Sequence, residues 1–234
     1  MRYTSVMEAV FISRPNRFIA NVMVNGREET VHVKNTGRCR ELLIPGVRVV
    51  LEDCRHIPNR KTRYSLIAVY KGDMLVNMDS QAPNGVIQEA VASGVLSLFP
   101  GSGRVESLQV KREVTYGNSR FDLMVTDGAR KRFIEVKGVT LEQEGLAAFP
   151  DAPTLRGARH LAELEGAVKE GHDAAVVFLV QMKGPKRFTP NDSMDPAFGK
   201  ALRRAAAAGV QVAAYDAVVT PDSMSLGNPL PVDL

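Results

Sequence analysis

The chain has 234 residues, a net charge of +4 and an apolar fraction of 44%, values typical of a globular protein of one or two domains. No run approaches the roughly 18 apolar residues of a transmembrane helix, and the N-terminus lacks the long apolar segment of a secretory signal. Cys39 and Cys54 have no metal-ligand spacing and are expected to be free thiols. These features favour a cytoplasmic protein with no membrane partner.

Short strands dominate the first part of the chain. A strand pattern over residues 18–24 leads into Asn25-Gly26, a strong two-residue hairpin signal. Further strands are expected over residues 30–33, 47–51, 64–70 and 74–78. Short strands joined by close turns predict a small OB-like β-barrel over residues 1–82, a fold that often binds oligonucleotides on one face.

The composition changes at residues 81–85, and a different pattern follows. A helix capped by Asn84 is expected first, because apolar residues recur at helical spacing after it. The later predicted elements are strands over 107–115, 119–126 and 132–138, a helix over 154–170, a strand over 174–181, a helix over 196–208 and a final strand over 210–215. This order predicts an α/β domain with a mixed central sheet over residues 83–234.

Asp122 and the triplet Glu135-Val136-Lys137 lie on two of these predicted strands, which a polar turn joins. Their pairing would bring two carboxylates and an ammonium together, a group that can hold Mg²⁺, or Mn²⁺ in its place, and act on a phosphodiester. Glu89, on the preceding helix, occupies the place of a third acidic metal ligand. The alternative is a solvated hairpin with a surface salt bridge, and the sequence pattern of these residues alone favours that alternative. The order of the surrounding elements favours the metal site.

Basic residues are concentrated between residues 27 and 63. Clustered cations suit a polyanion, because neutralised phosphates release condensed counterions. Arg156 and His160 lie four positions apart on a predicted helix and would share a face that could clamp a phosphate. A solvated surface with uneven charge is the alternative for the basic cluster. For the helical pair the alternative is an exposed Arg and a capped or packed His. The predicted nucleic-acid contacts are Arg38, Arg60, Lys61, Arg63, Arg120, Arg156 and His160.

An ordered set of segments between about residues 10 and 215 resembles the sugar fermentation stimulation protein family (SfsA). The segments are Asn35-Thr36-Gly37-Arg38, Glu41-Leu42-Leu43, Arg60-Lys61-Thr62-Arg63-Tyr64, Pro83-Asn84 with Glu89-Ala90, Arg120-Phe121-Asp122, Glu135-Val136-Lys137-Gly138 and Phe149-Pro150-Asp151. The resemblance implies an OB-like first domain and a second domain similar to PD-(D/E)XK nucleases. It also implies non-specific DNA binding and a regulatory role in sugar (maltose) metabolism. Carried over residue by residue, the nuclease-like acids fall on Glu89, Asp122 and Glu135, and the lysine on Lys137.

Three functions remain open from the sequence. The first is a Mg²⁺-dependent phosphodiesterase that acts on DNA or RNA through Glu89, Asp122, Glu135 and Lys137. The second is a regulator that binds DNA non-specifically without cleaving it. The third is a site for a small phosphorylated ligand connected to sugar metabolism. The oligomeric state is open as well, with a homodimer among the alternatives.

Overall fold

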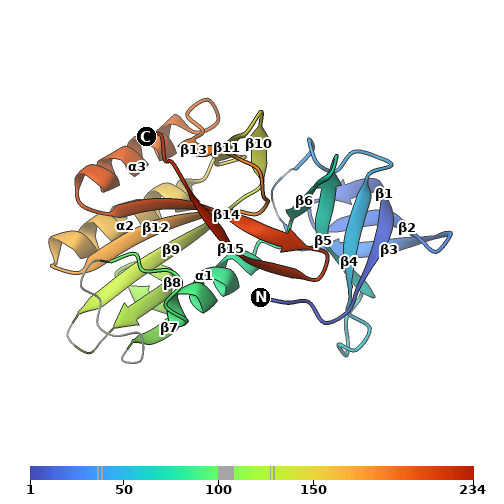
Figure 1. Cartoon of the computed structure of the whole chain (residues 1–234), viewed down its shortest axis with the longest axis horizontal. Helices are drawn as coiled ribbons and strands as arrows, with labels where there is room; N and C mark the ends of the chain where they lie inside the picture. Colours follow the sequence, from blue (N-terminus) through green and yellow to red (C-terminus); the bar gives the residue numbers. More distant parts are fainter. Residues whose placement is uncertain (36, 38, 100–107, 127, 129) are drawn as a thin grey trace.

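A computed structural model of the chain describes residues 1–35, 37, 39–99, 108–126, 128 and 130–234. Two lobes lie side by side, an all-β lobe formed by the N-terminal strands and a larger α/β lobe formed by the rest (Figure 1). Arg38, one of the predicted nucleic-acid contacts, lies outside the described residues. None of the described helices is long and apolar enough to cross a membrane.

The first lobe is a closed β-barrel. Its strands are β1 (Val6–Asn16), β2 (Ile19–Val24), β3 (Arg27–Val33), β4 (Arg48–Asp53), β5 (Tyr64–Lys71) and β6 (Met74–Asn77), in the order β3-β2-β1-β4-β5-β6. A parallel pairing of His32 with Ser65 closes the sheet on itself. Asn25 and Gly26 both have positive φ, as a tight hairpin between β2 and β3 requires. The predicted small barrel is therefore confirmed, with β1 as a strand that the sequence pattern had missed.

A six-stranded mixed sheet forms the centre of the second lobe. Its strands are β7 (Gln109–Tyr116), β8 (Ser119–Thr126), β9 (Lys131–Val139), β12 (Asp173–Val180), β14 (Gln211–Thr220) and β15 (Ser223–Leu230). They follow the order β15-β14-β12-β9-β8-β7, in which β9, β12 and β14 are parallel and the others antiparallel. The predicted mixed α/β domain is confirmed, but the predicted last strand is not the last, because β15 folds back beside it.

Helices cover both faces of this sheet. Helix α1 (Ala82–Ala92) packs on the face that carries Val177 and Leu179 of β12. Helices α2 (Leu155–Lys169) and α3 (Pro196–Ala207) pack on the face that carries Val176 and Phe178. The strand is buried on both faces, which explains its continuous apolar sequence. A further small sheet joins β10 (Leu141–Gln143), β11 (Leu146–Phe149) and β13 (Arg187–Pro190), none of which was predicted.

A buried polar contact joins the lobes beside α1. The amide of Gln181 donates to the backbone carbonyls of Asn77 and Asp79, at 3.1 Å in each case. Gly138 allows this approach, because a Cβ there would collide with the Gln181 side chain and lie 2.9 Å from a ring carbon of Pro83. The end of β9 therefore meets the junction of the lobes.

Candidate metal and nucleic-acid site

The sheet opens between β8 and β9 where the predicted acidic residues lie. Pairing of the two strands runs from Thr126↔Lys131 to Leu123↔Ile134 and goes no further. Beyond that point β8 stays paired with β7, while β9 stays paired with β12. Asp122 of β8 and Glu135 of β9 are the first residues beyond the last pair, where the two strands separate. We call this separation of β8 and β9 the fork.

Asp122 is held in this fork by two hydrogen bonds. The backbone N–H of Val136 donates to Oδ2 at 2.8 Å, and the side-chain amide of Asn84 donates to Oδ1 at 2.7 Å. Burial, and secondly the negative charge of Glu135, raise the pKa of Asp122. Asn84 is thus not the helix cap that the sequence predicted: Gln81 is the N-cap of α1 and makes no side-chain cap bond.

Glu135 is 2% exposed and lies between a lysine and a histidine. Its Oε1 accepts a hydrogen bond from Lys137 Nζ at 2.5 Å and a second from Nδ1 of His160. Burial favours the neutral acid, but these two partners outweigh it and hold the pKa of Glu135 below its ordinary value. Its Oε2 is buried without a hydrogen-bond partner among the described residues. Because buried carboxylate oxygens are normally paired, Oε2 is an acceptor that a bound cation could satisfy.

His160 lies on the inner side of α2 and is 2% exposed. Its Nε2 accepts from Arg156 Nε at 3.3 Å, so we assign the ring proton to Nδ1, which donates to Glu135. The imidazole is therefore turned toward the carboxylate, whereas the sequence had predicted a phosphate contact for it. Arg156, one turn earlier, is exposed. Thr154 caps this helix.

Glu89, the predicted third acidic ligand, does not lie with Asp122 and Glu135. Its exposed carboxylate forms an ion pair of 2.7 Å with the N-terminal ammonium of Met1, beside β15. At about 100° per residue, a side chain five positions after Asn84 points to a different side of α1. Among the described residues, no group of three or more His, Cys, Asp or Glu side chains is arranged to hold a metal. The fork itself supplies two carboxylates.

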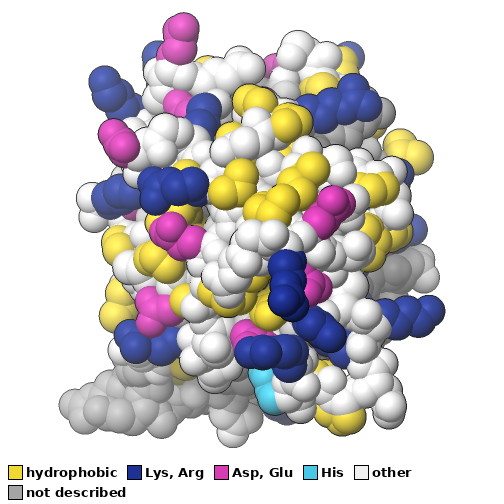
Figure 2. Space-filling model, turned by 90° about the vertical axis from the view of Figure 1, so that its right-hand side faces the viewer, with side chains coloured by type: hydrophobic (Ala, Val, Ile, Leu, Met, Phe, Trp, Pro, Cys, Tyr) yellow, Lys and Arg dark blue, Asp and Glu magenta, His cyan; other side chains and the backbone are white. Residues whose placement is uncertain are grey.

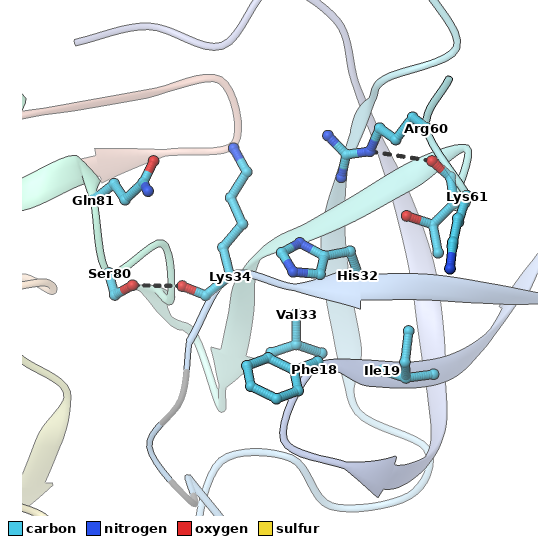
Figure 3. A pocket seen from close by; sticks show the side chains of 10 residues that line it. Phe18, Ile19, His32, Val33, Lys34, Arg60, Lys61, Ser80 and Gln81 are labelled. Carbon is cyan, nitrogen blue, oxygen red and sulfur yellow. Dashed lines mark hydrogen bonds between the residues drawn. The ribbon is translucent and has the colours of Figure 1, made fainter. Parts of the chain in front are cut away.

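Two of the arginines predicted to contact nucleic acid are paired with carboxylates. Arg63 pairs with Glu29 at 3.6 Å, and Arg120 pairs with Glu113. Lys and Arg side chains are interspersed with acidic and apolar ones over the barrel end of the molecule (Figure 2). Arg60 and Lys61 do come together, at a cavity of about 580 Å³ between the barrel and the segment before α1 (Figure 3).

Two family models match consecutive parts of the chain. "SfsA N-terminal OB domain" matches residues 12–78, and "Sugar fermentation stimulation protein RE domain" matches residues 81–223. The chain belongs to the sugar fermentation stimulation protein family (SfsA). The resemblance read from the sequence is therefore confirmed, and so is the OB character of the barrel.

Relatives of the same length accompany these matches. A sugar fermentation stimulation protein homolog of Alkaliphilus oremlandii is 54% identical, and the alignment covers 100% of this chain and 99% of the relative. A homolog of Desulfitobacterium hafniense is 52% identical with the same coverage. The solved structure of Pyrococcus furiosus SfsA in complex with Ca²⁺ has a TM-score of 0.87 at 26% identity and covers 100% of this chain and 98% of that one. Both lobes and their arrangement thus match a solved SfsA structure.

Proposed function

We propose that this SfsA protein binds DNA non-specifically and carries, in the fork of its sheet, a divalent-metal-dependent site that hydrolyses phosphodiester bonds. One observation carries this proposal: Asp122, Glu135 and Lys137 converge where the strands part, and Oε2 of Glu135 has no hydrogen-bond partner in the part of the chain that the structure describes. A purely structural ion pair does not account for that oxygen, because a buried polar atom without a hydrogen bond costs free energy.

The donor set fits Mg²⁺, with Mn²⁺ as the alternative. Mg²⁺ takes oxygen ligands, keeps several waters and is commonly held by one or two carboxylates together with substrate phosphates. Asp122 and Glu135 would hold it, with the carbonyl of Val136 as an additional ligand. Ca²⁺, which the Pyrococcus furiosus structure contains, is a cation of the same oxygen-binding class. The bound ion would polarise the phosphodiester and lower the pKa of a water molecule.

The surrounding side chains would orient these groups. The amide of Asn84 and the N–H of Val136 fix Asp122, and the imidazole of His160 fixes Glu135. Lys137 keeps an ammonium beside Glu135, with its side chain 15% exposed, where it can neutralise charge on a phosphate oxygen. Arg60 and Lys61 would contribute contacts to the DNA backbone.

A cleavage assay tests the proposal. Purified protein is incubated with labelled single-stranded and double-stranded DNA and RNA in Mg²⁺, in Mn²⁺ and in EDTA. We expect cleavage only with metal, its loss in Asp122→Asn and Glu135→Gln, and a fall of about 100-fold in Lys137→Met.

Glu89→Gln is the matched control, because the structure ties that carboxylate to Met1. Cleavage that survives Glu89→Gln would exclude Glu89 as a third ligand, whereas its loss would restore the role expected from the sequence. Wild-type protein that binds DNA but cleaves none of these substrates would contradict the catalytic part and leave the non-catalytic DNA-binding regulator.

A further inference from the structure

The cavity of about 580 Å³ at the edge of the barrel has the size of a small-ligand site. Phe18, Ile19 and Val33 form its apolar side, as Figure 3 shows. His32 projects from β3 and Lys34 directly follows that strand. Arg60 and Lys61 lie on one side of these two residues, and Ser80 and Gln81, which lead toward α1, lie on the other (Figure 3). An apolar wall beside several cations suits a ligand that has both a flat apolar part and a negative charge.

Phe18 carries an aromatic ring that is exposed to solvent. It is 51% exposed, although its backbone is fixed on the turn between β1 and β2. Its N–H donates to Asn16 Oδ1 at 2.9 Å, and its carbonyl accepts from the N–H of Val33 at 2.8 Å. A ring on a fixed backbone loses little freedom when a second flat group stacks on it. By contrast, Tyr64, at the start of β5, is only 7% exposed.

Two of the cations at this cavity, Arg60 and Lys61, have no carboxylate partner among the described residues. Arg60 is held by neutral groups, through Nε to the carbonyl of Thr62 at 3.2 Å and through a second nitrogen to the hydroxyl of Ser65. Lys61 is exposed and has no hydrogen bond or ion pair to any described residue. Lys34, in contrast, is neutralised by Glu52 and Asp79. The uncompensated positive charge is therefore on the Arg60–Lys61 side.

His32 adds a second flat group. Burial, followed by the cations of Arg60 and Lys34, lowers the pKa of His32, which favours the neutral imidazole. Neither of its ring nitrogens has a hydrogen-bond partner among the residues that the structure describes, so both remain available to a ligand. The amide of Gln81, on the far side of the cavity, can both donate and accept a hydrogen bond.

We propose that this cavity binds one unpaired nucleotide of a DNA strand, with the base against Phe18 and a phosphate on Arg60 and Lys61. A base within a duplex is stacked on both faces, so only an unstacked base can present a face to a ring at the wall of a cavity. The preferred substrate of the proposed nuclease is therefore single-stranded or locally unpaired DNA.

The cavity is also connected to the forked sheet. Gln81, which lines it, is the N-cap of α1, and Asn84 in the first turn of the same helix binds Asp122. A strand that left the cavity past Gln81 would reach the proposed metal site along that first turn. The same helix therefore positions both the bound nucleotide and the carboxylate.

Because this assignment rests on the proposed function, we separate binding from cleavage by measuring affinity in EDTA. Fluorescence anisotropy of a labelled oligodeoxythymidylate is compared with that of a labelled duplex of equal length. Wild-type protein should bind the single strand more tightly. Phe18→Ala should weaken single-strand binding by about 10-fold and leave duplex binding unchanged, while Phe18→Trp should keep it. Lys61→Ala should lower the salt slope by about one.

Met23→Ala is the matched control, since Met23 is an apolar side chain on the same barrel that is 38% exposed. It should bind like the wild type, and thermal melting should show all variants folded. Equal single-strand affinity in Phe18→Ala and Met23→Ala, or a preference for the duplex, would overturn the assignment. If Phe18→Ala loses single-strand affinity and the wild-type protein cleaves no substrate, the assignment of the cavity is upheld. The proposed nuclease activity is then contradicted. An oligouridylate in the same assay distinguishes DNA from RNA, and tighter binding of the RNA would overturn the choice of DNA.

Discussion

Glu135 is a charged side chain in a nearly water-free position, and its partners explain how it stays ionised. Lys137 comes from the same strand and His160 from α2, so one contact is local and the other is tertiary. Asp122, across the fork, has its pKa moved in the opposite direction, chiefly by burial. Two neighbouring carboxylates with pKa values moved apart are characteristic of functional sites.

His160 gives the first residue-scale prediction. It orients Glu135 without facing solvent, so its removal should weaken the hold on a metal rather than contact with DNA. We expect His160→Ala to lower the affinity for Mn²⁺ by about 10- to 100-fold, the range for groups that orient a metal ligand. His160→Asn, whose amide can replace the Nδ1–H donor, should restore part of it. Isothermal titration calorimetry measures this affinity, and anisotropy in EDTA should show unchanged DNA binding.

An unchanged Mn²⁺ affinity in a folded His160→Ala protein would mean that the imidazole only fills space beside Phe121, with which its ring makes an edge contact at 6.3 Å.

Residues of the site differ in how far sequence could reveal them. Asp122, Glu135 and Lys137 belong to two adjacent strands, so period-two spacing and a short turn were enough to predict their meeting. The contacts of Asn84 and His160 depend on how α1 and α2 pack on the sheet, which spacing along the chain does not encode. Glu89 is an intermediate case. The sequence predicted its helix, but it did not reveal that the Glu89 side chain points away from Asp122 and Glu135. Its metal role stays a prediction, which Glu89→Gln decides.

The fork between β8 and β9 is the element that creates the site. Both strands were predicted from their apolar alternation, but the point at which their pairing ends was not. That point depends on β7 and β12, which keep their own partners, and on the first turn of α1. Strands β10, β11 and β13 escaped prediction because three or four residues are too few to establish a period of two.

Helix α2 provides an element-scale prediction, since it carries His160. Thr154 Oγ1 accepts from the N–H of Gly157 at 3.0 Å, and its own N–H donates to Asp195 Oδ2 at 2.8 Å. Thr154→Ala removes only the first of these bonds. The free energy of unfolding should fall by about 1 kcal/mol, the usual value of such a cap. Urea denaturation followed by circular dichroism measures it.

Thr154→Ser, which keeps the hydroxyl, should unfold close to the wild type and serves as the control. Equal destabilisation by Ala and Ser would assign the effect to the lost methyl group instead of the cap.

At the scale of the whole molecule, two lobes are joined by contacts between residues far apart in the chain. A change in composition near residue 82 was enough to expect two parts, but nothing local marks Gln181 or Glu142 as interface residues. Near the N-terminus, Met1 contacts Met224 and Tyr3 contacts Asp222, so the chain begins against the far lobe. The cavity at the barrel edge and the fork in the sheet depend on this arrangement, because Gln81 at the N-terminus of α1 lines the cavity and Asn84 in the first turn of α1 binds Asp122.

The ion pair between Lys71 of β5 and Glu142 of β10 makes this junction sensitive to pH. Their charged atoms lie 2.5 Å apart, and Glu142 also accepts the N–H of Gly145 at 2.6 Å. Burial favours the neutral acid, but these partners dominate and lower the pKa of Glu142. A carboxylate whose pKa is lower in the folded protein stabilises it above the unfolded pKa, about 4.3, and loses that effect as pH falls through the folded pKa.

Melting temperatures of the wild type and Glu142→Gln should therefore differ most at pH 6 to 7 and converge toward pH 3. The difference at neutral pH should correspond to about 1 kcal/mol, since Lys71 is partly exposed. Differential scanning calorimetry at several pH values measures it. Glu8→Gln is the control, because Glu8 is exposed and pairs only within the barrel, at 3.7 Å from Arg48. A wild-type advantage that stays constant from pH 7 to pH 3 would show that the charge of Glu142 does not hold the lobes together.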